Sequence, residues 1–455
     1  MNAARSVRFD RGTVELGQDV PALDGVLWDP RTSSRRMAAY RYADLVARVD
    51  AAQCALAGDL RDSWSARPRD TSALELRSYQ REALAAWTAF ARRGVVVLPT
   101  GAGKTRVAIA AIFASGLPTA VLCPTRALAS AWLAELGRWL DHPVGLIGDG
   151  ERRVERVTVM TFESAFRHMD TLGDRFGLLV VDEIHHFGSG ARLEALEASP
   201  AVARLGLTAT APKRGTEQAA RIEALVGPVV FEMGYEELVG KDLAPVDFVR
   251  IYVRLEDDER EQYLAWTRAF GEMRRAFLRS YPGADIASLL RALGRSPEGL
   301  RALRDHARAR ELAGFPRAKR ALVRTLLDRH RTDRTIIFTA FAENAYALAL
   351  DNLVPVIAAE TSARERQDIL ARFRDGKLRA IASARVLNEG IDVPEARVAL
   401  IVAGTLGERE HIQRIGRVLR PAPEKRALVY ELLTTGTADA RRAGMRTEHA
   451  PHTAA

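Results

Sequence analysis

The stretch VVVLPTGAGKT at residues 95–105 constrains the fold of this chain more than any other feature. A β-branched run leads into a glycine-containing turn, and the RVAIAAIFA that follows has helical character. Between a strand and a helix, such glycines let backbone N–H groups face phosphate oxygens, and the helix N-terminus adds positive charge. The alternative is a plain turn that contains Gly-Lys-Thr. The strand–loop–helix setting favours a phosphate-binding loop, and therefore an α/β fold.

Individual residues of this loop have predictable tasks. Lys104 can bridge the β- and γ-phosphates of ATP, and the Thr105 hydroxyl can ligate Mg²⁺. Pro99 stands where the full consensus has its first glycine, so the match is to the PTGxGKT variant. We therefore expect the nucleotide to be bound by Thr100, Gly101, Ala102, Gly103, Lys104 and Thr105.

A second stretch, LVVDEIHHFG at residues 179–188, supplies the acids that ATP hydrolysis needs. Asp182 closes an apolar run, and the carboxyl end of a parallel strand is where a Mg²⁺-holding acid lies beside a phosphate loop. Glu183 can orient and deprotonate the attacking water. The pair predicts the metal and base side of an ATPase, with Thr105 and Asp182 as the metal-binding residues.

Two neighbouring histidines in the same stretch raise the alternative of a zinc site. His185 and His186 are adjacent and point in different directions, whereas a metalloprotease helix places its histidines four residues apart. The chain has two cysteines, Cys54 and Cys123, without CxxC spacing. We therefore expect Mg²⁺ rather than zinc. His186 has no role that the sequence predicts, and a packed or solvent-facing side chain is its simplest interpretation.

Further segments follow in the order found in superfamily-2 helicases, which the chain resembles from about residue 75 to residue 435. In the first half, LRSYQREAL (76–84) matches the Q motif, LCPTRALASAW (122–132) motif Ia, VTVMTFESA (157–165) motif Ib and LTATAPKR (207–214) motif III. In the second half, RTIIFTAF (334–341) matches motif IV, SARVLNEGIDVPEA (383–396) motif V and QRIGRVLRP (413–421) motif VI.

The closer resemblance is to XPB-type helicases, especially the compact archaeal and bacterial forms. It rests on DEIHH, on QRIGRVLRP, on TSARERQDILARFRDGKLRAIAS and on the opening VRFDRGTVEL, and it covers nearly the whole chain. One departure is clear. After motif III the archaeal members carry Arg-Glu-Asp, whereas Arg214 is followed here by Gly215 and Thr216.

The resemblance implies roles for residues outside the phosphate loop. The adenine is expected to be read by Arg77 and Gln80, and His185 to couple ATP chemistry to the grip on the strand through motif III or VI. Arg417 and Arg420, three apart and so on one helix face, are expected to reach the γ-phosphate from the second domain. Gln413 is expected to orient water, and Gly390 and Asp392 to link nucleotide and DNA. DNA phosphates are assigned to Thr125, Arg126, Thr161, Thr361, Ser362 and Ser383.

The expected fold class is α/β, with two RecA-like P-loop domains, a small N-terminal α+β domain and a helical thumb-like insertion. The expected boundaries are 1–70 for the N-terminal domain, 71–240 for the first helicase domain, 241–436 for the second with its insertion at about 256–316, and 437–455 for a disordered tail. Arginines recur at helix-face spacing in the insertion, which predicts a DNA clamp or, alternatively, a solvated charged hairpin: Arg274, Arg275, Arg279, Arg301, Arg304 and Arg308.

Net charge adds limited support for a nucleic-acid partner. The chain carries +9 at pH 7, but only six of its 67 basic residues are lysines, a pattern that a GC-rich genome also produces. No apolar run is long enough to span a membrane and the N-terminus has no secretory h-region, so we expect a cytoplasmic protein without membrane partners.

Taken with the resemblance, these features predict an ATP- and Mg²⁺-dependent DNA helicase or translocase, with 3′→5′ polarity and DNA repair implied by the family. The expected partners are single-stranded DNA and fork or duplex junctions, with a companion nuclease implied by the family, and the expected state is a monomer. Two alternatives remain open. One is a DNA-dependent ATPase that remodels duplex without separating strands, and the other is a nucleic-acid-binding scaffold with an idle ATP site.

Overall fold

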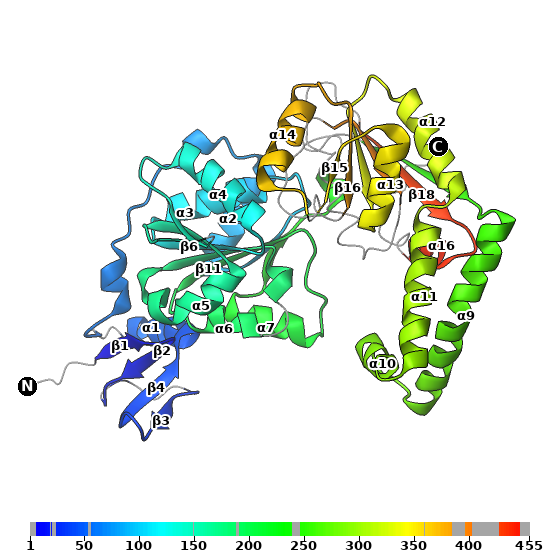
Figure 1. The fold of residues 1–455 in the computed structure, drawn as a ribbon. Coiled ribbons are helices and arrows are strands. Elements are labelled where there is room, and N and C mark those ends of the chain that lie inside the picture. The colour runs from blue at the N-terminus through cyan, green and yellow to red at the C-terminus, as the bar shows by residue number, and fades with distance from the viewer. Residues whose placement is uncertain are drawn as a thin grey trace, which may run out of the picture. The chain divides into compact units, whose positions relative to one another are not determined.

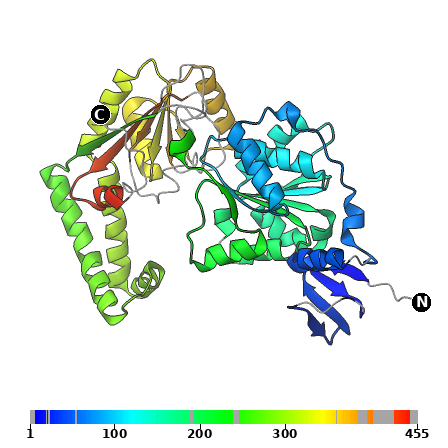
Figure 2. The ribbon, with the colours of Figure 1, turned by 180° about the vertical axis from the view of Figure 1, so that it is seen from behind.

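The chain divides into two compact units close to residue 238 (Figures 1 and 2). The computed structural model describes residues 6–18, 20, 24–52, 56–148, 150–187, 191–238, 246–358, 360–384, 396–402 and 427–445. Among these residues, no helix combines the length and the apolar composition that a bilayer span requires.

The N-terminal part of the first unit is a small sheet with one helix. Its four antiparallel strands run in the order β1-β2-β4-β3, and α1 (Tyr42–Ala51) follows them. Val14, Met37 and Leu45 are buried between sheet and helix. Trp64, 1% exposed, donates from Nε1 to the carbonyl of Asp174 at 2.6 Å and so ties this part to the short 3-10 turn Gly173–Arg175 in the rest of the first unit. The strands are β1 (Val7–Asp10), β2 (Thr13–Leu16), β3 (Leu27–Asp29) and β4 (Ser34–Ala38).

The rest of the first unit is an eight-stranded sheet in the order β12-β5-β11-β10-β6-β9-β7-β8, parallel except for the edge pair β7–β8. Its central strands are apolar on both faces because helices cover both sides, as parallel sheets require. The strands are β5 (Arg93–Val97), β6 (Thr119–Cys123), β7 (Gly145–Gly148), β8 (Glu151–Arg153), β9 (Val157–Thr161), β10 (Leu178–Asp182), β11 (Ala203–Thr208) and β12 (Val229–Glu232).

Six helices flank this sheet. Figure 1 shows the first three on one side and the last three on the other, where they share a core with β5, β6 and β10. They are α2 (Ser78–Ala89), α3 (Lys104–Ser115), α4 (Arg126–Trp139), α5 (Phe162–Leu172), α6 (Glu194–Glu197) and α7 (Glu217–Leu225); the short α8 (Tyr235–Leu238) ends the unit.

The second unit contains a six-stranded parallel sheet in the order β13-β18-β17-β14-β16-β15. The central strand β14 is fully buried, as the apolar TIIFT predicts. The strands are β13 (Val246–Val253), β14 (Thr335–Thr339), β15 (Val356–Ile357), β16 (Ala380–Ala384), β17 (Val398–Ile401) and β18 (Ala427–Thr434); the helices α12 (Arg317–Arg329), α13 (Ala342–Asn352) and α14 (Ala363–Arg374) accompany them.

A helical hairpin lies between β13 and α12, within the segment predicted to be a thumb-like insertion (Figures 1 and 2). It consists of α9 (Asp257–Ser280), α10 (Ile286–Leu293) and α11 (Pro297–Gly314). Phe270 of α9 stacks on His306 of α11 with ring centroids 4.0 Å apart, and Leu289 and Leu293 of α10 complete that cluster. At the base of the hairpin, Arg317 pairs with Glu256, the N-cap of α9, and with Asp258 in its first turn.

The expectation that residues 437–455 are disordered is wrong for their first part. Residues Ala438–Met445 form helix α16. Asp439 is buried and accepts a hydrogen bond from the buried ammonium of Lys319 at 2.8 Å, and the backbone N–H of Thr434 donates to the same carboxylate. The partner of Asp439 lies 120 residues away in the sequence, so local composition gave no sign of it. Residues 446–455 lie outside the described residues.

Candidate nucleotide and nucleic-acid sites

The phosphate loop has the backbone that its sequence predicts. Gly101 and Gly103 have φ values of 90° and 78°, a region that favours glycine because it has no Cβ. Gly103 is also the N-cap of α3, so the loop leads directly into a helix N-terminus. Lys104 begins that helix and donates from Nζ to the carbonyl of Leu98 at 3.2 Å. Thr105 follows in the first turn, at the position expected for a Mg²⁺-ligating hydroxyl.

The segment DEIH (182–185) corresponds to helicase motif II, and its acids Asp182 and Glu183 lie at the carboxyl end of β10, as expected from the apolar run before them. Asp182 is 7% exposed. Burial and the charge of Glu183 raise the pKa of Asp182 to about 6, while Lys104 acts in the opposite direction. Glu183 adopts φ 51°, in the left-handed region that costs a non-glycine residue free energy and that often marks functional positions.

The donor set of this region suits Mg²⁺. Asp182 and Thr105 offer a carboxylate and a hydroxyl, and Mg²⁺ is commonly held by one or two such oxygens together with water and substrate phosphates. Among the described residues, the buried atoms Thr100 Oγ1 and Glu183 Oε2 have no hydrogen-bond partner. Buried polar atoms of this kind are suited to meet water or a ligand.

His185 contacts motif III, as the resemblance implied. Its Nδ1 lies 3.1 Å from Thr208 Oγ1. Thr208 Oγ1 also lies 3.0 Å from the carbonyl of Thr210, and when it donates its proton there, Nδ1 of His185 supplies the proton of the bond to Thr208. His186 is exposed, with its ring centroid 4.3 Å from that of His185. Motif II is therefore joined to motif III by a side-chain hydrogen bond.

The Q-motif glutamine has a task that the sequence did not reveal. Gln80 is buried, its Nε2 donates to the carbonyl of Ala102 at 2.9 Å, and its Oε1 accepts from the backbone N–H of Arg77 at 3.0 Å. Tyr79 donates to the same Ala102 carbonyl. A Cβ on Gly103 would come within 2.5 Å of the amide nitrogen of Gln80. The Q motif thus supports the phosphate loop directly, and adenine recognition by Arg77 and Gln80 stays a prediction.

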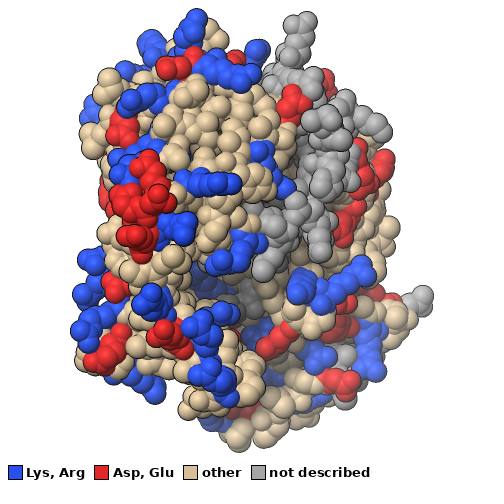
Figure 3. All heavy atoms as spheres, turned by 90° about the vertical axis from the view of Figure 1, so that its right-hand side faces the viewer, with Lys and Arg blue, Asp and Glu red and all other residues tan. Residues whose placement is uncertain are grey.

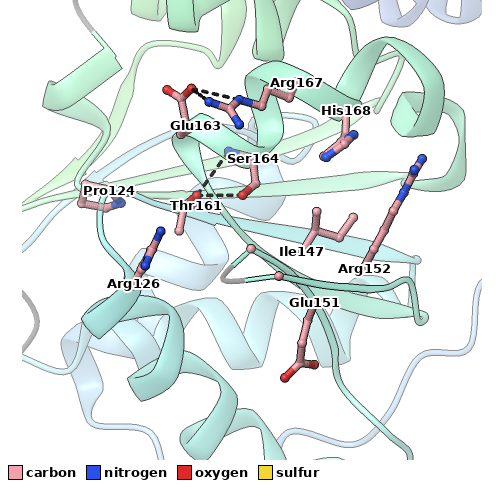
Figure 4. Close-up of a pocket in the computed structure, with 12 residues that line it drawn as sticks. Pro124, Arg126, Ile147, Glu151, Arg152, Thr161, Glu163, Ser164, Arg167 and His168 are labelled. Atoms are coloured by element: carbon pink, nitrogen blue, oxygen red, sulfur yellow. Dashed lines mark hydrogen bonds and ion pairs between the residues drawn. The ribbon is translucent and has the colours of Figure 1, made fainter. Parts of the chain in front are cut away.

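A hollow of about 610 Å³ lies where motifs Ia and Ib meet the β7–β8 hairpin (Figure 4). Arg126 lies on one side of it, and Arg152 and His168 lie on the other. Thr161 is the N-cap of α5, and its Oγ1 accepts from the backbone N–H of Ser164 at 3.2 Å. Motif assignment identified Arg126 and Thr161 but did not include Arg152, which lies on β8 where no helicase motif was assigned, or His168, which lies on α5 three residues beyond the motif Ib segment.

Thr125 caps the neighbouring helix in the same way. Its Oγ1 accepts from the backbone N–H of Leu128 at 3.3 Å, at the start of α4. In the second unit, Ser362 repeats the arrangement at the start of α14, where its Oγ accepts from the backbone N–H of Glu365, and Thr361 before it accepts from the backbone N–H of Ala358. Helix N-termini with hydroxyl caps favour phosphate binding because their N–H groups and dipole attract anions.

Ser383 does not fit its predicted role. Its side chain is fully buried within β16, between β14 and β15, so a DNA phosphate does not reach it in this structure. Motif position suggested an accessible hydroxyl, whereas the strand places it in the core. The predicted nucleotide residues Gly390, Asp392, Gln413, Arg417 and Arg420 lie outside the described residues.

The positions that replace the archaeal Arg-Glu-Asp triplet have a structural use. Gly215 adopts φ 76°, and Thr216 caps α7 by accepting from the backbone N–H of Ala219 at 3.2 Å. Glycine and threonine are suited to a turn that leads into a helix. This chain therefore uses both positions to begin α7.

The helical hairpin exposes its arginines to solvent. All six that the sequence singled out are exposed, and Arg301 and Arg308 pair with acids of their own helix. The face that carries the hairpin shows basic groups interspersed with acidic ones (Figure 3). The role of these arginines as a DNA clamp stays a prediction.

Trp132 was missed by the motif assignment although it ends the motif Ia segment. Its indole Nε1 donates to Asp182 Oδ2 at 2.9 Å, and both side chains are buried. A tryptophan six residues after Arg126 on a helix was the available signal, but the sequence does not say which strand end it meets.

Three family descriptions match the chain. Residues 7–57 match "Xeroderma pigmentosum group B helicase damage recognition domain", residues 73–213 match "Type III restriction enzyme, res subunit", and residues 318–422 match "Helicase conserved C-terminal domain".

Known proteins with related sequences carry helicase and translocase names. The chain is 34% identical over 445 residues to the DNA 3'-5' translocase XPB2 of Sulfurisphaera tokodaii, which covers 97% of this chain and 99% of that protein. It is 29% identical over 391 residues to the DNA 3'-5' helicase XPB of Mycobacterium tuberculosis, which covers 82% of this chain and 63% of that protein.

A solved structure supports the fold. The crystal structure of the Pyrococcus furiosus Hef helicase domain matches with a TM-score of 0.54 at 17% identity, covering 84% of this chain and all of that one. The predicted α/β class, with two helicase domains, an N-terminal domain and a helical insertion, is confirmed.

Proposed function

Because the chain belongs to the XPB family of ATP-dependent DNA helicases and translocases, we propose that it moves 3′→5′ along DNA and opens duplex during repair. The observation that carries the proposal is the arrangement in the first unit of a phosphate loop, a buried Asp182 followed by the half-buried Glu183, and a motif II histidine bound to motif III. Each part has a defined task in converting ATP hydrolysis into movement.

Hydrolysis begins with water beside Glu183, which accepts a proton while the water oxygen attacks the γ-phosphorus. The bond from that phosphorus to the β–γ bridging oxygen breaks, and ADP and phosphate are formed. Lys104 and the N–H groups of the loop hold the phosphates. Thr105 and Asp182 would hold Mg²⁺, which would supply positive charge beside the phosphate oxygens.

The second domain completes the reaction. Arg417 and Arg420 act as arginine fingers, an effect of roughly 10³-fold or more on rate, and Gln413 orients the water. Closure of the two domains on ATP and reopening after hydrolysis drive a step along the strand. His185 reports the state of the phosphates to motif III through Thr208.

DNA phosphates lie along the hydroxyl-capped helix starts of both domains. Thr125, Arg126 and Thr161 hold them in the first domain, and Thr361 and Ser362 hold them in the second. Contacts to phosphates position the protein without reading sequence. We expect weak sequence preference and a steep fall of affinity with salt.

The direct test is ATP turnover by the full chain with single-stranded DNA, with RNA and without either. We expect DNA to stimulate turnover and Lys104→Ala to abolish it. Turnover that is identical in all three conditions would contradict DNA-driven function and favour a scaffold with an idle or uncoupled ATP site. Stimulation by RNA alone would contradict the choice of DNA.

Strand separation is a finer claim than movement, and the relative in Sulfurisphaera tokodaii is named a translocase. Displacement of a strand from a 3′-tailed duplex, but not from a 5′-tailed one, is the expected result. Displacement of a triplex-forming third strand without duplex opening would favour the DNA-remodelling alternative.

The hairpin is proposed to clamp DNA during opening. Deletion of residues 260–312 should leave ATP hydrolysis without DNA intact and abolish duplex opening. Opening that survives the deletion would refute the clamp.

A role of the N-terminal domain in repair predicts tighter binding to damaged than to intact duplex, and equal binding would refute it.

A further inference from the structure

Trp132 connects the start of the DNA path to the acid that holds Mg²⁺. It lies on α4, six residues beyond Arg126, which is about 9 Å along a helix axis. Its indole Nε1 donates to Asp182 Oδ2 at 2.9 Å. Trp132 is 2% exposed and Asp182 is 7% exposed, so water does not compete for the bond.

The hydrogen bond fixes the orientation of the carboxylate. The other oxygen of Asp182, Oδ1, accepts from the backbone N–H of Glu183 at 3.0 Å. Each oxygen of the carboxylate therefore has one donor within the protein. The indole N–H is a neutral group that donates only, so it orients the carboxylate without placing a cation where Mg²⁺ must bind.

The same helix begins at the proposed DNA contacts. Thr125 caps α4, and Arg126 is the first residue of the helix and lines the hollow of Figure 4. A helix transmits displacement of its first turn along its axis because its backbone hydrogen bonds keep it rigid. A shift of α4 on DNA binding would change the angle at which the indole meets Asp182, and hydrogen bonds weaken steeply as that angle departs from linear.

We propose that Trp132 is a positioning residue that transmits DNA engagement at the start of α4 to the Mg²⁺-holding carboxylate of Asp182. This inference rests on the proposed function, because it presupposes DNA-stimulated ATP hydrolysis. Trp132 touches neither nucleotide nor water in this role, and it acts only through Asp182. The competing interpretation is that Trp132 does no more than fill the space between α4 and the sheet.

The test removes the N–H group while keeping a ring in place. Trp132→Phe is the first variant, and Trp132→benzothienylalanine, in which sulfur replaces the N–H in a ring of nearly the same shape, guards against loss of packing. Two controls match it. Trp139→Phe removes an indole bond to Glu135 on the same helix, and Trp87→Phe removes a buried indole bond to the carbonyl of Arg204 in the same domain.

Four quantities are measured on the full chain: the thermal midpoint, binding of a single-stranded oligonucleotide, the Mg²⁺ concentration that half-saturates binding of a fluorescent ATP analogue, and ATP turnover with and without the oligonucleotide. In the Trp132 variants we expect the half-saturating Mg²⁺ concentration to rise about tenfold, the order expected for loss of a hydrogen bond to a charged group. We expect the stimulation by DNA to fall at least about fivefold while oligonucleotide affinity stays within about twofold.

The controls decide between positioning and packing. Trp87→Phe should lower the thermal midpoint but leave the Mg²⁺ requirement and the stimulation ratio as in the unaltered chain, and Trp139→Phe should change none of the four quantities. The inference is overturned if the Trp132 variants keep both the Mg²⁺ requirement and the stimulation ratio, or if Trp87→Phe changes them equally. If the unaltered chain is not stimulated by DNA at all, the proposed function fails and this inference fails with it.

Discussion

Helices α4 and α5 begin in the same way but contact the segment 182–187 through different kinds of interaction, a hydrogen bond from α4 and an aromatic contact from α5. Each is capped by a threonine at the carboxyl end of a parallel strand, β6 or β9. From α4, Trp132 donates a hydrogen bond to Asp182, whereas from α5, Phe162 packs on Phe187 with ring centroids 3.9 Å apart. A hydrogen bond depends on direction and an apolar contact does not. The difference suggests that α4 transmits orientation and α5 supplies stability.

The largest effect is expected at Glu183, the proposed catalytic base. Glu183→Gln removes the base that accepts the proton of water and keeps the size of the side chain. Hydrolysis should fall by about 10²- to 10⁴-fold while nucleotide binding is kept. Single-turnover hydrolysis and binding of an ATP analogue measure the two separately, and Lys104→Ala, which should lose binding as well, is the control. A fall of less than about tenfold would mean that a residue other than Glu183 accepts the proton. The two helices could then not be compared by their contacts to one catalytic centre.

The next effect tests the claim that α5 acts through packing. Phe162→Ala removes a side chain that is 1% exposed, and it should lower the free energy of unfolding of the first unit by about 3–5 kcal/mol. Urea unfolding followed by tryptophan fluorescence reports mainly on this unit, because five of the six tryptophans lie before residue 238.

The same variant has a second readout that sharpens the contrast with α4. Under conditions in which Phe162→Ala remains folded, the ratio of ATP turnover with DNA to turnover without DNA should match that of the unaltered chain. A large loss of this ratio would mean that α5 also transmits DNA engagement, and the distinction between the two helices would not hold.

Local geometry explains which parts of these sites the sequence could predict. The backbone conformation of Gly101 and Gly103 was predictable, because a phosphate loop requires glycine where its backbone curls. Both residues have positive φ. Asp182 was predicted at a strand end because an apolar run stops there. The resemblance implied that His185 acts through motif III or motif VI, and the structure places it against Thr208 of motif III. Each of these inferences depends on residues close in sequence or on a motif.

Long-range partners explain what the sequence could not predict. Trp132 meets Asp182 across 50 residues, and Lys319 meets Asp439 across 120. Neither pair has a spacing that indicates contact. The amide of Gln80 was assigned to adenine by its motif, yet it binds the carbonyl of Ala102, because the fold brings α2 against the phosphate loop. Pairings of this kind become visible only when the strand order is known.

A smaller effect is expected for single arginines at the hollow that α4 and α5 share. Arg126→Ala and Arg152→Ala should each weaken binding of single-stranded DNA by about tenfold or less and reduce the slope of log affinity against log salt by about 0.7. Arg138→Ala is the control, because Arg138 lies at the other end of α4 and pairs with Glu135. Anisotropy titrations at several salt concentrations measure the slope. If the slope is the same in all three variants, the hollow does not bind phosphate.

The variants with the smallest expected effect compare the two helices most directly, because the same group is removed from each helix. Thr125→Ala and Thr161→Ala each delete an N-cap hydroxyl, and each should cost about 1 kcal/mol of stability. Among the described hydrogen bonds of these two helices, only that of Trp132 on α4 reaches Asp182, so at saturating DNA Thr125→Ala should also lower the stimulation of ATP turnover, whereas Thr161→Ala should weaken DNA binding alone. Thermal midpoints and turnover ratios of the two variants, measured side by side, provide the test. Equal loss of stimulation in both would assign the effect to phosphate contact alone and remove any special role of α4.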